Sequence, residues 1–581
     1  MRLSKHLADL ASSTLQSALA LDERPNPLLR PADPKHGDYQ LNAAMALAKT
    51  LGRKPRDIAE EAATELTKLD AVASADIAGP GFINLKLDQG WLAAQLSASL
   101  SDPRLGVDPV AEPETIVVDF SSPNTAKEMH IGHIRSTIIG FAIVQLLREI
   151  GHEVIGDNHL GDWGTQFGLL IEGLREWGDE AKLKADGVAE LERLYKLATA
   201  KKSEDDAFAD KARAALADLQ QGDPESRALW ERFMAITHEA FEAVYDRLGV
   251  EFDEWLGESA YQDRLDGVVG MLRDKGLAKE DQGAIGVFFQ DLEGELPKSL
   301  RKNESPFIVR KKDGAFNYAT TDVATILYRK ERWNADRGVY VVDTRQGLHF
   351  QQLFEVAKRL GVEMELTHVG FGKILGADGK PLRTRDGGVP KLMPFLDEAE
   401  QKARERIEEG RASGRLRIEE GDVDEAVRVI GIGAVKYADL MQNRTTDYRF
   451  DPDKLIEFKG QAAPYLQYQV ARIRSIFRKG GETLEGFTAP IALEHEREQA
   501  LARVLARYAD VVHAAAESYQ PHLVCDHVYE VATAFSGFYD DCPVLDAEGS
   551  ARASRLALSA LSEHQLTRGL GLLGIGVLDK M

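Results

Sequence analysis

The chain has 581 residues, of which 44% are hydrophobic and 29% are charged, a composition that excludes a largely disordered protein. Its length exceeds what one hydrophobic core usually supports, so we expect three or four domains. The formal net charge of −22 argues against nonspecific coating of nucleic acid, so a polyanion would have to bind through local basic patches.

Residues 1–110 are expected to form a small α+β domain. Helical apolar spacing runs through residues 4–20 and 56–66, and HGDYQLNAAMALAKTLG predicts a helix that ends at Gly52. AGPGFINLKLD then predicts a turn and a short strand, followed by a helix over residues 88–98. The turn-rich stretch SDPRLGVDPVAEPE marks a domain boundary near residue 110.

A strand, a loop, a helix and a second strand follow. ETIVVDF is the first strand, SSPNTAKEMHIG the loop, HIRSTIIGFAIVQLLREI a helix that stops at Gly151, and HEVIGDNHLGDWG the next strand with its loop. This βαβ unit predicts a parallel sheet covered by helices, in which ligands bind beyond the carboxyl ends of the strands.

Residues 170–260 are largely helical and charged, and their charge runs are interpreted as solvated helix faces. The short strands GVFF, PFIVRKKDGAFNY and RGVYVVD, with a helix in GLHFQQLFEVAKRLG, predict the second half of the sheet. We therefore predict a Rossmann-type α/β domain over residues 111–400, with a helical insertion over about 170–300.

Beyond about residue 395 the predicted strands stop, and the remaining segments show the 3.6-residue period of helices. This predicts a C-terminal α-helical bundle over residues 401–581. Cys525 and Cys542 are too few for a disulfide framework or a cysteine-rich zinc site. With no long apolar core at the N-terminus and no run of eighteen apolar residues, we expect a cytoplasmic protein that is neither secreted nor membrane-spanning.

The loop SSPNTAKEMHIGHIRST contains His130 and His133, whose spacing is compatible with a metal site, a phosphate site or simple packing in a turn. A usual zinc set needs a third protein ligand, and no HExxH or cysteine pair lies nearby, so we expect no metal. The loop follows a strand and opens a helix, whose N-terminal N–H groups and dipole suit phosphate. Gly132 is expected to let a ligand approach closely.

The tetrapeptide His130, Ile131, Gly132 and His133 resembles the HIGH signature of class I aminoacyl-tRNA synthetases. The wider string, followed by NHLGDWGTQFG, resembles the arginyl-tRNA synthetase family, and the resemblance extends from residue 36 to the C-terminus. It implies an arginine–tRNA ligase that activates L-arginine with ATP and Mg²⁺ to arginyl-adenylate. Arginine would then pass to the 3′ end of tRNA(Arg), releasing AMP after pyrophosphate. Catalytic roles are implied for Lys127, His130, Gly132 and His133, with both histidines also contacting ATP.

Class I enzymes also carry a mobile KMSKS loop, to which GADGKPLRTRDGG corresponds. No lysine stands at the second-lysine position, assigned to Thr384 or its neighbour. With Thr384, the residues Lys380, Arg383 and Arg385 are expected to bind ATP, although a solvated basic turn is the alternative. Family members with a degraded loop have the lysine just before HIGH, which here is Lys127.

A site for arginine needs a carboxylate and further acceptors to match a planar guanidinium. Tyr318 and Asp322 are four residues apart and could face one side of a helix, although Asp322 could instead cap that helix. The resemblance favours arginine binding, because the YATTD context matches the family's arginine-reading motif. It also implies that Gln346 and Asn124 contact arginine. Asp119, an acidic residue at the end of a strand, is implied to do the same.

The segment PYLQYQVARIRSIFRKGG places Tyr465, Tyr468, Arg472 and Arg474 at helical spacings. Arginines can meet phosphates while aromatic rings stack on unpaired bases, but a buried aromatic stripe with a basic outer face is an equal alternative. The segment resembles the anticodon-binding domain of the family. HGDYQLNAA and GPGFINLKL resemble its N-terminal additional domain, which reaches the tRNA elbow.

Two other functions fit parts of the sequence. A HIGH-type nucleotidyltransferase acting on a small molecule would not need two flanking domains similar to tRNA readers. A non-catalytic RNA-binding relative would have no chemical reason to keep Lys127, His130 and His133 together. We therefore expect a monomeric enzyme whose partners are tRNA(Arg), L-arginine and ATP. We expect no DNA or membrane partner, no tightly bound cofactor and no structural metal.

Overall fold

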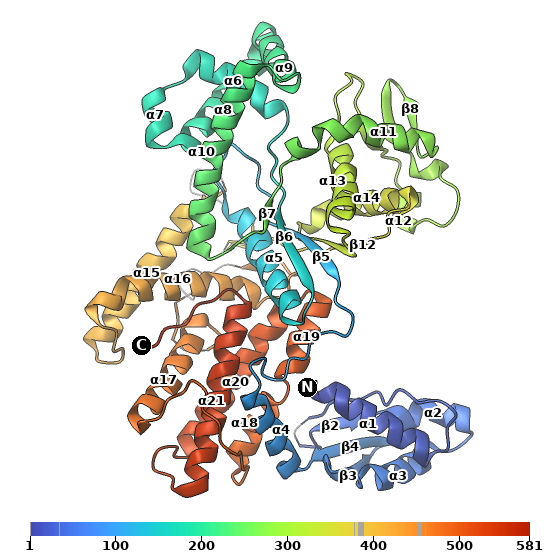
Figure 1. Cartoon of the computed structure of the whole chain (residues 1–581), viewed down its shortest axis with the longest axis vertical. Helices are drawn as coiled ribbons and strands as arrows, with labels where there is room; N and C mark the ends of the chain where they lie inside the picture. The colour runs from blue at the N-terminus through green and yellow to red at the C-terminus, as the bar shows by residue number, and fades with distance from the viewer. Residues whose placement is uncertain (1, 34, 377, 381–388, 450–455, 459) are drawn as a thin grey trace. The chain divides into compact units, whose positions relative to one another are not determined.

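The computed structural model describes the chain except residues 1, 34, 377, 381–388, 450–455 and 459. Its internal contacts divide it into two compact units (Figure 1), the first of Met1–Val110, Lys402–Met441 and Leu455–Met581 and the second of Ala111–Gln401 and Gln442–Lys454. None of the helices in the described ranges combines the length and the apolarity that a membrane crossing requires.

The first unit begins with an antiparallel sheet of strand order β1-β2-β4-β3. Its strands are β1 (Arg30–Pro31), β2 (Tyr39–Leu41), β3 (Val72–Ala78) and β4 (Phe82–Leu87). The accompanying helices are α1 (Leu3–Ala18), α2 (Ala43–Leu51), α3 (Pro55–Leu66) and α4 (Gln89–Ser101). The predicted helices and β4 are confirmed. β3 was not predicted, because its segment contains Ala, Ser and Asp, which have little intrinsic preference for strands. β2 was not predicted, because its three residues lie in the segment assigned to the start of the following helix.

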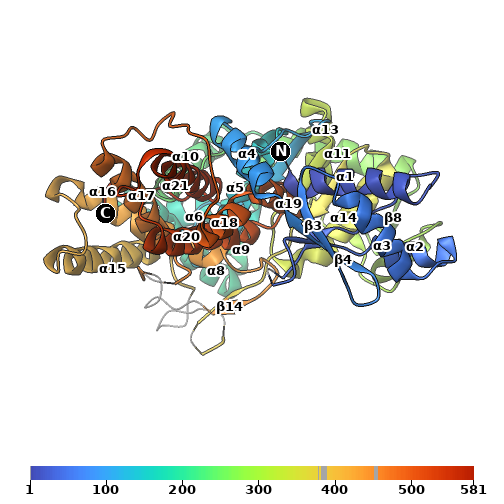
Figure 2. The same ribbon diagram turned by 90° about the horizontal axis from the view of Figure 1, so that it is seen from below.

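The rest of the first unit is the predicted helical bundle. Its helices are α16 (Val423–Leu440), α17 (Ala463–Gly480), α18 (Glu496–Leu505), α19 (Tyr508–Ser518), α20 (His522–Asp541) and α21 (Gly549–Leu572). The short 3₁₀ turn η4 (Glu420–Asp422) precedes α16, and α15 (Leu392–Ala412) runs across the division between the units. α21 packs against α17, α18 and α20, as Figure 2 also shows.

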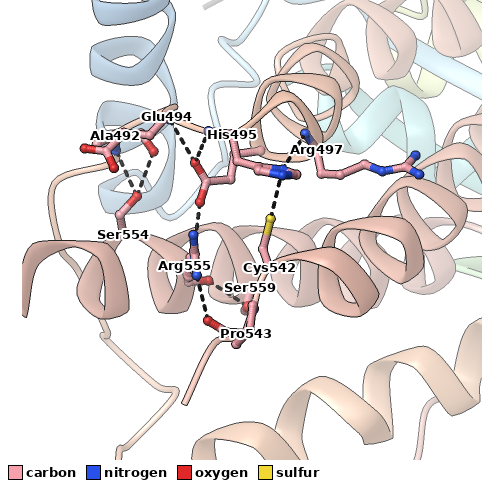
Figure 3. A network of polar contacts seen from close by, with 10 residues as sticks. Ala492, Glu494, His495, Arg497, Cys542, Pro543, Ser554, Arg555 and Ser559 are labelled. Atoms are coloured by element: carbon pink, nitrogen blue, oxygen red, sulfur yellow. Dashed lines mark hydrogen bonds and ion pairs between the residues drawn. The ribbon is translucent and has the colours of Figure 1, made fainter. Parts of the chain in front are cut away.

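A polar network joins the start of α18 to α21 (Figure 3). The Glu498 carboxylate accepts the backbone N–H of His495 at 2.9 Å and the Arg555 Nε–H at 2.8 Å. The Cys542 thiol lies 3.3 Å from Nδ1 of His495 and is buried. Both cysteines are free and buried, and burial raises the pKa of the Cys542 thiol, which favours its neutral form.

The second unit is built on a five-stranded parallel sheet of order β12-β11-β5-β6-β7. Its strands are β5 (Thr115–Asp119), β6 (Glu153–Asn158), β7 (Glu254–Trp255), β11 (Arg337–Tyr340) and β12 (Glu365–His368). The helix α5 (Ile131–Glu149) connects β5 to β6, confirming the predicted βαβ unit. From β5 the chain continues to β6 on one side of the sheet, and β11 later pairs with β5 on the other side. The strand order therefore changes direction at β5, and folds of this kind bind ligands at such a point.

Close packing fixes α5 against the sheet. A Cβ atom at Gly140 would lie 2.2 Å from the Cβ atom of Phe120, a distance no real pair of carbon atoms adopts. Glycine is therefore required at this point of α5, and the N-terminus of the helix is held at the carboxyl end of β5.

The first part of the predicted insertion is helical. It consists of α6 (Thr165–Trp177), α7 (Glu180–Ala185), α8 (Gly187–Glu204), α9 (Asp206–Gln220) and α10 (Pro224–Leu248), with α6 packed against both α8 and α9. Most of its ion pairs lie on exposed faces, as between Arg232 and Glu180, whose side chains are 41% and 73% exposed.

Of the three strands predicted for the second half of the parallel sheet, in GVFF, PFIVRKKDGAFNY and RGVYVVD, only the last joins that sheet. The prediction was wrong for the other two. β8 (Ala278–Asp281), β9 (Ala284–Val287) and β10 (Phe307–Arg310) form a separate antiparallel sheet, and only β11 belongs to the main one. Gln282 and Gly283, both with positive φ, form a two-residue turn between β8 and β9. Such a turn makes a hairpin and cannot connect parallel strands.

Further elements complete the second unit. They are the 3₁₀ turns η1 (Glu258–Arg264), η2 (Phe289–Asp291) and η3 (Thr344–Gln346), the helices α11 (Leu265–Asp274), α12 (Lys298–Arg301), α13 (Tyr318–Trp333) and α14 (Gly347–Leu360), and the paired strands β13 (Ile374–Leu375) and β14 (Tyr448–Arg449).

Candidate active site

The backbone of the loop after β5 is strained, and contacts with α5 and α10 hold it in this conformation. Ser121, Ser122 and Ala126 all have positive φ, which is costly for residues with a side chain. The Ser121 backbone N–H donates to Ser136 Oγ at 2.9 Å, and its own hydroxyl lies 2.8 Å from the hydroxyl of Tyr245. Strain of this kind persists where the surrounding structure imposes it, and it is common at functional sites.

His130 and His133 form a reciprocal cap on α5. The backbone N–H of His130 donates to Nδ1 of His133, and the N–H of Gly132 donates to Nδ1 of His130, each at 3.1 Å. The two rings stack with their centroids 3.9 Å apart. Since each Nδ1 accepts a backbone N–H, the proton of each neutral imidazole must lie on Nε2.

The same surroundings keep both imidazoles neutral. Burial, with a smaller contribution from His130, lowers the pKa of His133 to about 3. Burial also lowers the pKa of His130. Near pH 7 the pair therefore presents two Nε2–H donors at a helix N-terminus, as a phosphate site requires. The sequence predicted histidine donors here, and the structure adds which nitrogen donates.

Gly132 packs closely against a neighbouring side chain, and the predicted close approach of a ligand stays a prediction. A Cβ atom at this position would lie 2.8 Å from Cε1 and Nδ1 of the His130 ring. The glycine is thus required by the neighbouring histidine, whatever ligand approaches.

Of the loop predicted to correspond to KMSKS, residues 376–388, the structure describes only Gly376 and residues 378–380. Arg383, Thr384 and Arg385 lie outside the described residues. Lys380 is exposed in a turn in which its carbonyl accepts the Gly376 N–H at 2.8 Å. After the loop, the Ile131 N–H donates to the Pro390 carbonyl and the Leu392 N–H to the Met129 carbonyl, each at 2.9 Å. This backbone pairing ties the segment after the loop to the HIGH turn.

Lys127 lies in the loop before α5, half-buried. Its Nζ atom is 4.5 Å from the centroid of the Tyr195 ring, which belongs to α8 of the insertion. The sequence placed this lysine next to the histidines but gave no sign of Tyr195.

Asp119 ends β5 and is buried in an ion pair with Arg329 of α13. Arg329 Nη2 donates to Asp119 Oδ2 at 2.7 Å and to Asp157 Oδ2 at 2.6 Å, while Ser122 Oγ donates to Asp119 Oδ1 at 2.8 Å. Burial raises the pKa of Asp157, and Arg329 opposes that shift. Both oxygens of Asp119 are thus engaged within the protein, and its contact with arginine stays a prediction.

Asp119, Asp157 and His159 bring possible metal ligands within 4.8 Å of one another. The guanidinium of Arg329 already bonds to both carboxylates, so this cluster has a cation of its own. The arrangement is that of a buried ion-pair network in which one guanidinium bonds to two carboxylates.

Tyr318 and Asp322 lie one turn apart at the start of α13, as predicted from their spacing. The capping alternative for Asp322 is wrong, because Asn317 is the N-cap residue and Asp322 lies within the helix. His349 of α14 approaches Asp322, with Nε2 to Oδ2 at 2.6 Å, and its ring lies 4.9 Å from that of Tyr318.

The remaining predicted arginine contacts, Gln346 and Asn124, are both exposed. Gln346 ends η3, immediately before α14, which carries His349. Asn124 pairs through its backbone with Gly161, in the loop after β6. This pairing joins the HIGH loop to the loop that carries Asp162.

Glu258 and Asp162 are acidic residues of this region that the sequence analysis missed. Burial, followed by the charges of Asp322 and Asp162, raises the pKa of Glu258 to about 8. Asp162 accepts the N–H and the hydroxyl of Ser259, at 2.9 and 2.6 Å, whereas no side chain among the described residues donates to the Glu258 carboxylate. Carboxylates that raise one another's pKa form a site that favours a bound cation. No sequence pattern connects Glu258 with Asp322, which lies in another element.

The proposed tRNA-binding residues of α17 fall into two groups. Tyr468 lines a cavity of about 570 Å³ together with Arg406, Arg415 and Phe458. Tyr465 is half-buried, and its hydroxyl lies 3.5 Å from the Ala532 carbonyl.

The two arginines of α17 are engaged within the first unit. Arg474 donates to the nearly buried Glu563 at 2.8 Å and pairs with Asp579. Arg472 lies over the Tyr539 ring at 4.3 Å and within 3.8 Å of Asp540. Their contacts with tRNA stay predictions, and the geometry favours Tyr468 over Arg474 as an available side chain.

Three protein-family models match the chain in succession. One described as Arginyl tRNA synthetase N terminal domain matches residues 3–87, one described as tRNA synthetases class I (R), catalytic domain matches 95–452, and one described as DALR anticodon binding domain matches 466–581.

Similarity to individual proteins extends over the whole chain. An Arginine–tRNA ligase of Alteromonas mediterranea is 45% identical over 589 aligned positions, with 100% of both chains covered, and one of Pseudomonas aeruginosa is 46% identical over 559, with 94% of both covered. The crystal structure of the arginyl-tRNA synthetase from Plasmodium falciparum has a TM-score of 0.84 at 26% identity and covers 100% of this chain and 99% of its own.

Proposed function

Because the chain belongs to the arginyl-tRNA synthetases, a class I aminoacyl-tRNA synthetase family, we propose that the residues around the HIGH turn and α13 form its active site. The protein is an arginine–tRNA ligase. It activates L-arginine with ATP to arginyl-adenylate, releasing pyrophosphate, and transfers arginine to the 3′ end of tRNA(Arg), releasing AMP.

The observation that carries the assignment of the site is the pairing of the loops after β5 and β6. The Gly161 N–H donates to the Pro123 carbonyl, and the Thr125 hydroxyl donates to the Gly161 carbonyl at 2.9 Å. The first loop leads to the histidine donors and the second to Asp162. A donor site for phosphate and an acidic site for a cation are therefore joined by backbone contacts at the carboxyl edge of the sheet.

Activation requires the arginine carboxylate to attack the α-phosphorus of ATP as pyrophosphate leaves. Negative charge grows on the phosphoryl oxygens and on the leaving group, and prepositioned donors stabilise it without having to reorganise. We assign this role to the Nε2–H groups of His130 and His133 and to the ammonium of Lys127. Lys380, Arg383, Thr384 and Arg385 are proposed to contact ATP from the loop, and Mg²⁺ would accompany ATP as part of the substrate.

The guanidinium of arginine is proposed to bind between Asp322 and Glu258. A planar cation with several N–H groups can bond to two carboxylates at once, and it would favour the ionised form of Glu258. Tyr318 would cover the guanidinium, while Asn124, Gln346 and Asp119 would contribute to the remainder of the amino acid site, Asp119 through the Arg329 network.

We propose that residues 1–110 contact the tRNA elbow and that residues 401–581 bind the anticodon, with residues 111–400 forming the catalytic domain. The match to an anticodon-binding family over residues 466–581 supports the second role. The cavity beside Tyr468 offers an aromatic ring together with Arg415, a combination suited to an unpaired base and its phosphate, whereas Arg406 in the same cavity pairs with Glu409 at 3.0 Å. Cytoplasmic location and a monomeric state stay predictions.

Arginine-dependent exchange of pyrophosphate into ATP tests the proposal. The assay is run with and without tRNA(Arg), with lysine and citrulline as competitors. We expect exchange with arginine and weak competition by citrulline, which has the shape of arginine but no positive charge. Citrulline competing as strongly as arginine would refute the carboxylate assignment. No exchange under either condition would refute the assigned chemistry.

A further inference from the structure

Lys127 has an unusual environment for a lysine in an acidic protein. Among the residues that the structure describes, no carboxylate forms an ion pair with its ammonium, and its recorded partner is the ring of Tyr195, 4.5 Å from Nζ to the centroid. The ammonium nevertheless lies close enough to His130 to oppose protonation of that imidazole and lower its pKa, after the larger effect of burial. The charge is thus beside the histidine pair and is not neutralised.

Tyr195 is itself held in place by the core of the insertion. It lies on α8 and packs against a small buried cluster of Leu169, Ala198, Phe208 and Ala212, which α6, α8 and α9 contribute. A ring fixed in this way can hold a cation without moving. The face of α8 at Tyr195 is therefore an exception to the solvated charge runs expected in this insertion.

The nearest acidic side chain on the same helix is occupied elsewhere. Glu192 lies one turn before Tyr195. Its negative charge raises the pKa of His130, opposing the effect of burial, so Glu192 lies near the histidine pair. Its carboxylate forms an ion pair with Lys196, the residue after Tyr195. An ion pair from Glu192 to Lys127 would have neutralised the ammonium, whereas an aromatic ring attracts the cation and leaves its full charge available to a phosphate.

We propose that Tyr195 is a positioning residue for the activation of arginine: its ring holds the Lys127 ammonium beside His130, ready for the phosphates of ATP. This inference rests on the proposed role of Lys127 in the chemistry above. It gives the helical insertion a function in the active site, because α8 of the insertion positions the ammonium of Lys127 in the HIGH loop.

Replacement of the ring separates this role from simple packing. Tyr195→Leu should lower kcat for arginine-dependent pyrophosphate exchange roughly 2- to 30-fold, the range that loss of one cation–π contact produces, and leave KM for arginine nearly unchanged. Tyr195→Phe keeps the ring and should retain kcat within about 2-fold of the parent enzyme. Leu197→Ala, at a 39% exposed position of the same helix, is the matched control and should change neither constant.

A double-mutant cycle distinguishes failure of this inference from failure of the proposed function. If Lys127→Ala alone leaves kcat unchanged, the proposed role of Lys127 is wrong. If Lys127→Ala lowers kcat but Tyr195→Leu does not, Lys127 acts and Tyr195 does not position it. The proposal requires that Tyr195→Leu lower kcat in the parent enzyme and have no further effect when Lys127 is already alanine. A full additional loss in that background, or an equal loss in Tyr195→Phe, would overturn it.

Discussion

Replacing Asp322 by asparagine removes one negative charge from the proposed guanidinium site and changes little else. The two side chains have nearly the same volume, and the asparagine oxygen can still accept a hydrogen bond from His349, whose Nε2 lies 2.6 Å from the carboxylate. The arginine substrate would lose a charge-assisted hydrogen bond, worth about 1.5 to 3 kcal/mol. The lower half of this range is expected, because the Asp322 side chain is 28% exposed and partly screened by solvent.

A second effect also reduces the expected loss. Burial, the larger cause of the raised pKa of Glu258, is unchanged in this variant, but the charge of Asp322 also contributes, so its removal should lower that pKa and increase the ionised fraction of Glu258 at neutral pH. One carboxylate would then still bind the guanidinium. We therefore expect KM for arginine to rise about 10- to 40-fold in Asp322→Asn, with KM for ATP changed less than about 2-fold.

Steady-state pyrophosphate exchange, with arginine and ATP varied in turn, measures both constants. Glu331→Gln is the matched control: it removes a carboxylate from the same helix, at a side chain that is 66% exposed and paired with Arg264. Equal increases in the two Michaelis constants of Asp322→Asn, or an arginine KM no higher than that of Glu331→Gln, would refute the guanidinium assignment.

Three further predictions follow from the same geometry. With its pKa at about 8, Glu258 is mostly protonated at pH 7, whereas a bound guanidinium favours its ionised form, so arginine binding at pH 7 should release up to one proton. The release should become smaller as the pH rises past 8 and should be absent in Glu258→Gln. Calorimetry in two buffers of different ionisation enthalpy measures the released protons, and equal release by the variant would contradict the prediction. Gly140→Ala should lower the thermal midpoint through an overpacking cost of at least about 1 to 3 kcal/mol, whereas Gly267→Ala, in a helix where a Cβ atom meets nothing within 4 Å, should not. Gly132→Ala should displace the His130 ring and lower kcat for activation with little change in thermal midpoint; unchanged kcat would show that the ring tolerates the added methyl group.

Local periodicity and motif spacing made much of this fold predictable. The strand, loop and helix around the HIGH turn are contiguous, so their apolar pattern and turn residues report directly on β5 and α5. The helical bundle and the first part of the insertion carry the 3.6-residue period and are helical. The later part of the predicted insertion, beyond Leu248, contains the strands β7, β8 and β9. The segments of β9 and β10 were assigned to the wrong sheet, because short strands show their type but not their partners. The hairpin at Gln282 and Gly283 pairs β9 with β8, which was not predicted, and β10 pairs on the other side of β9.

The site was predictable where its residues share a motif and unpredictable where they meet only in space. The spacing of Tyr318 and Asp322 correctly placed them on one helix, and that of His130 and His133 correctly placed them at a helix N-terminus. Glu258 gave no signal, since a single acidic residue far along the chain resembles any other.

The family, the order of the elements and the chemical type of the HIGH turn could be predicted, because each depends on residues that are near one another in the chain. The charge states and partners of the site residues, in contrast, depend on the tertiary structure. It buries Asp119 against Arg329, brings Glu258 under the influence of Asp322, and sets Lys127 over Tyr195. Electrostatic energies depend on distance and burial, and folding alone brings together groups separated by tens to hundreds of residues.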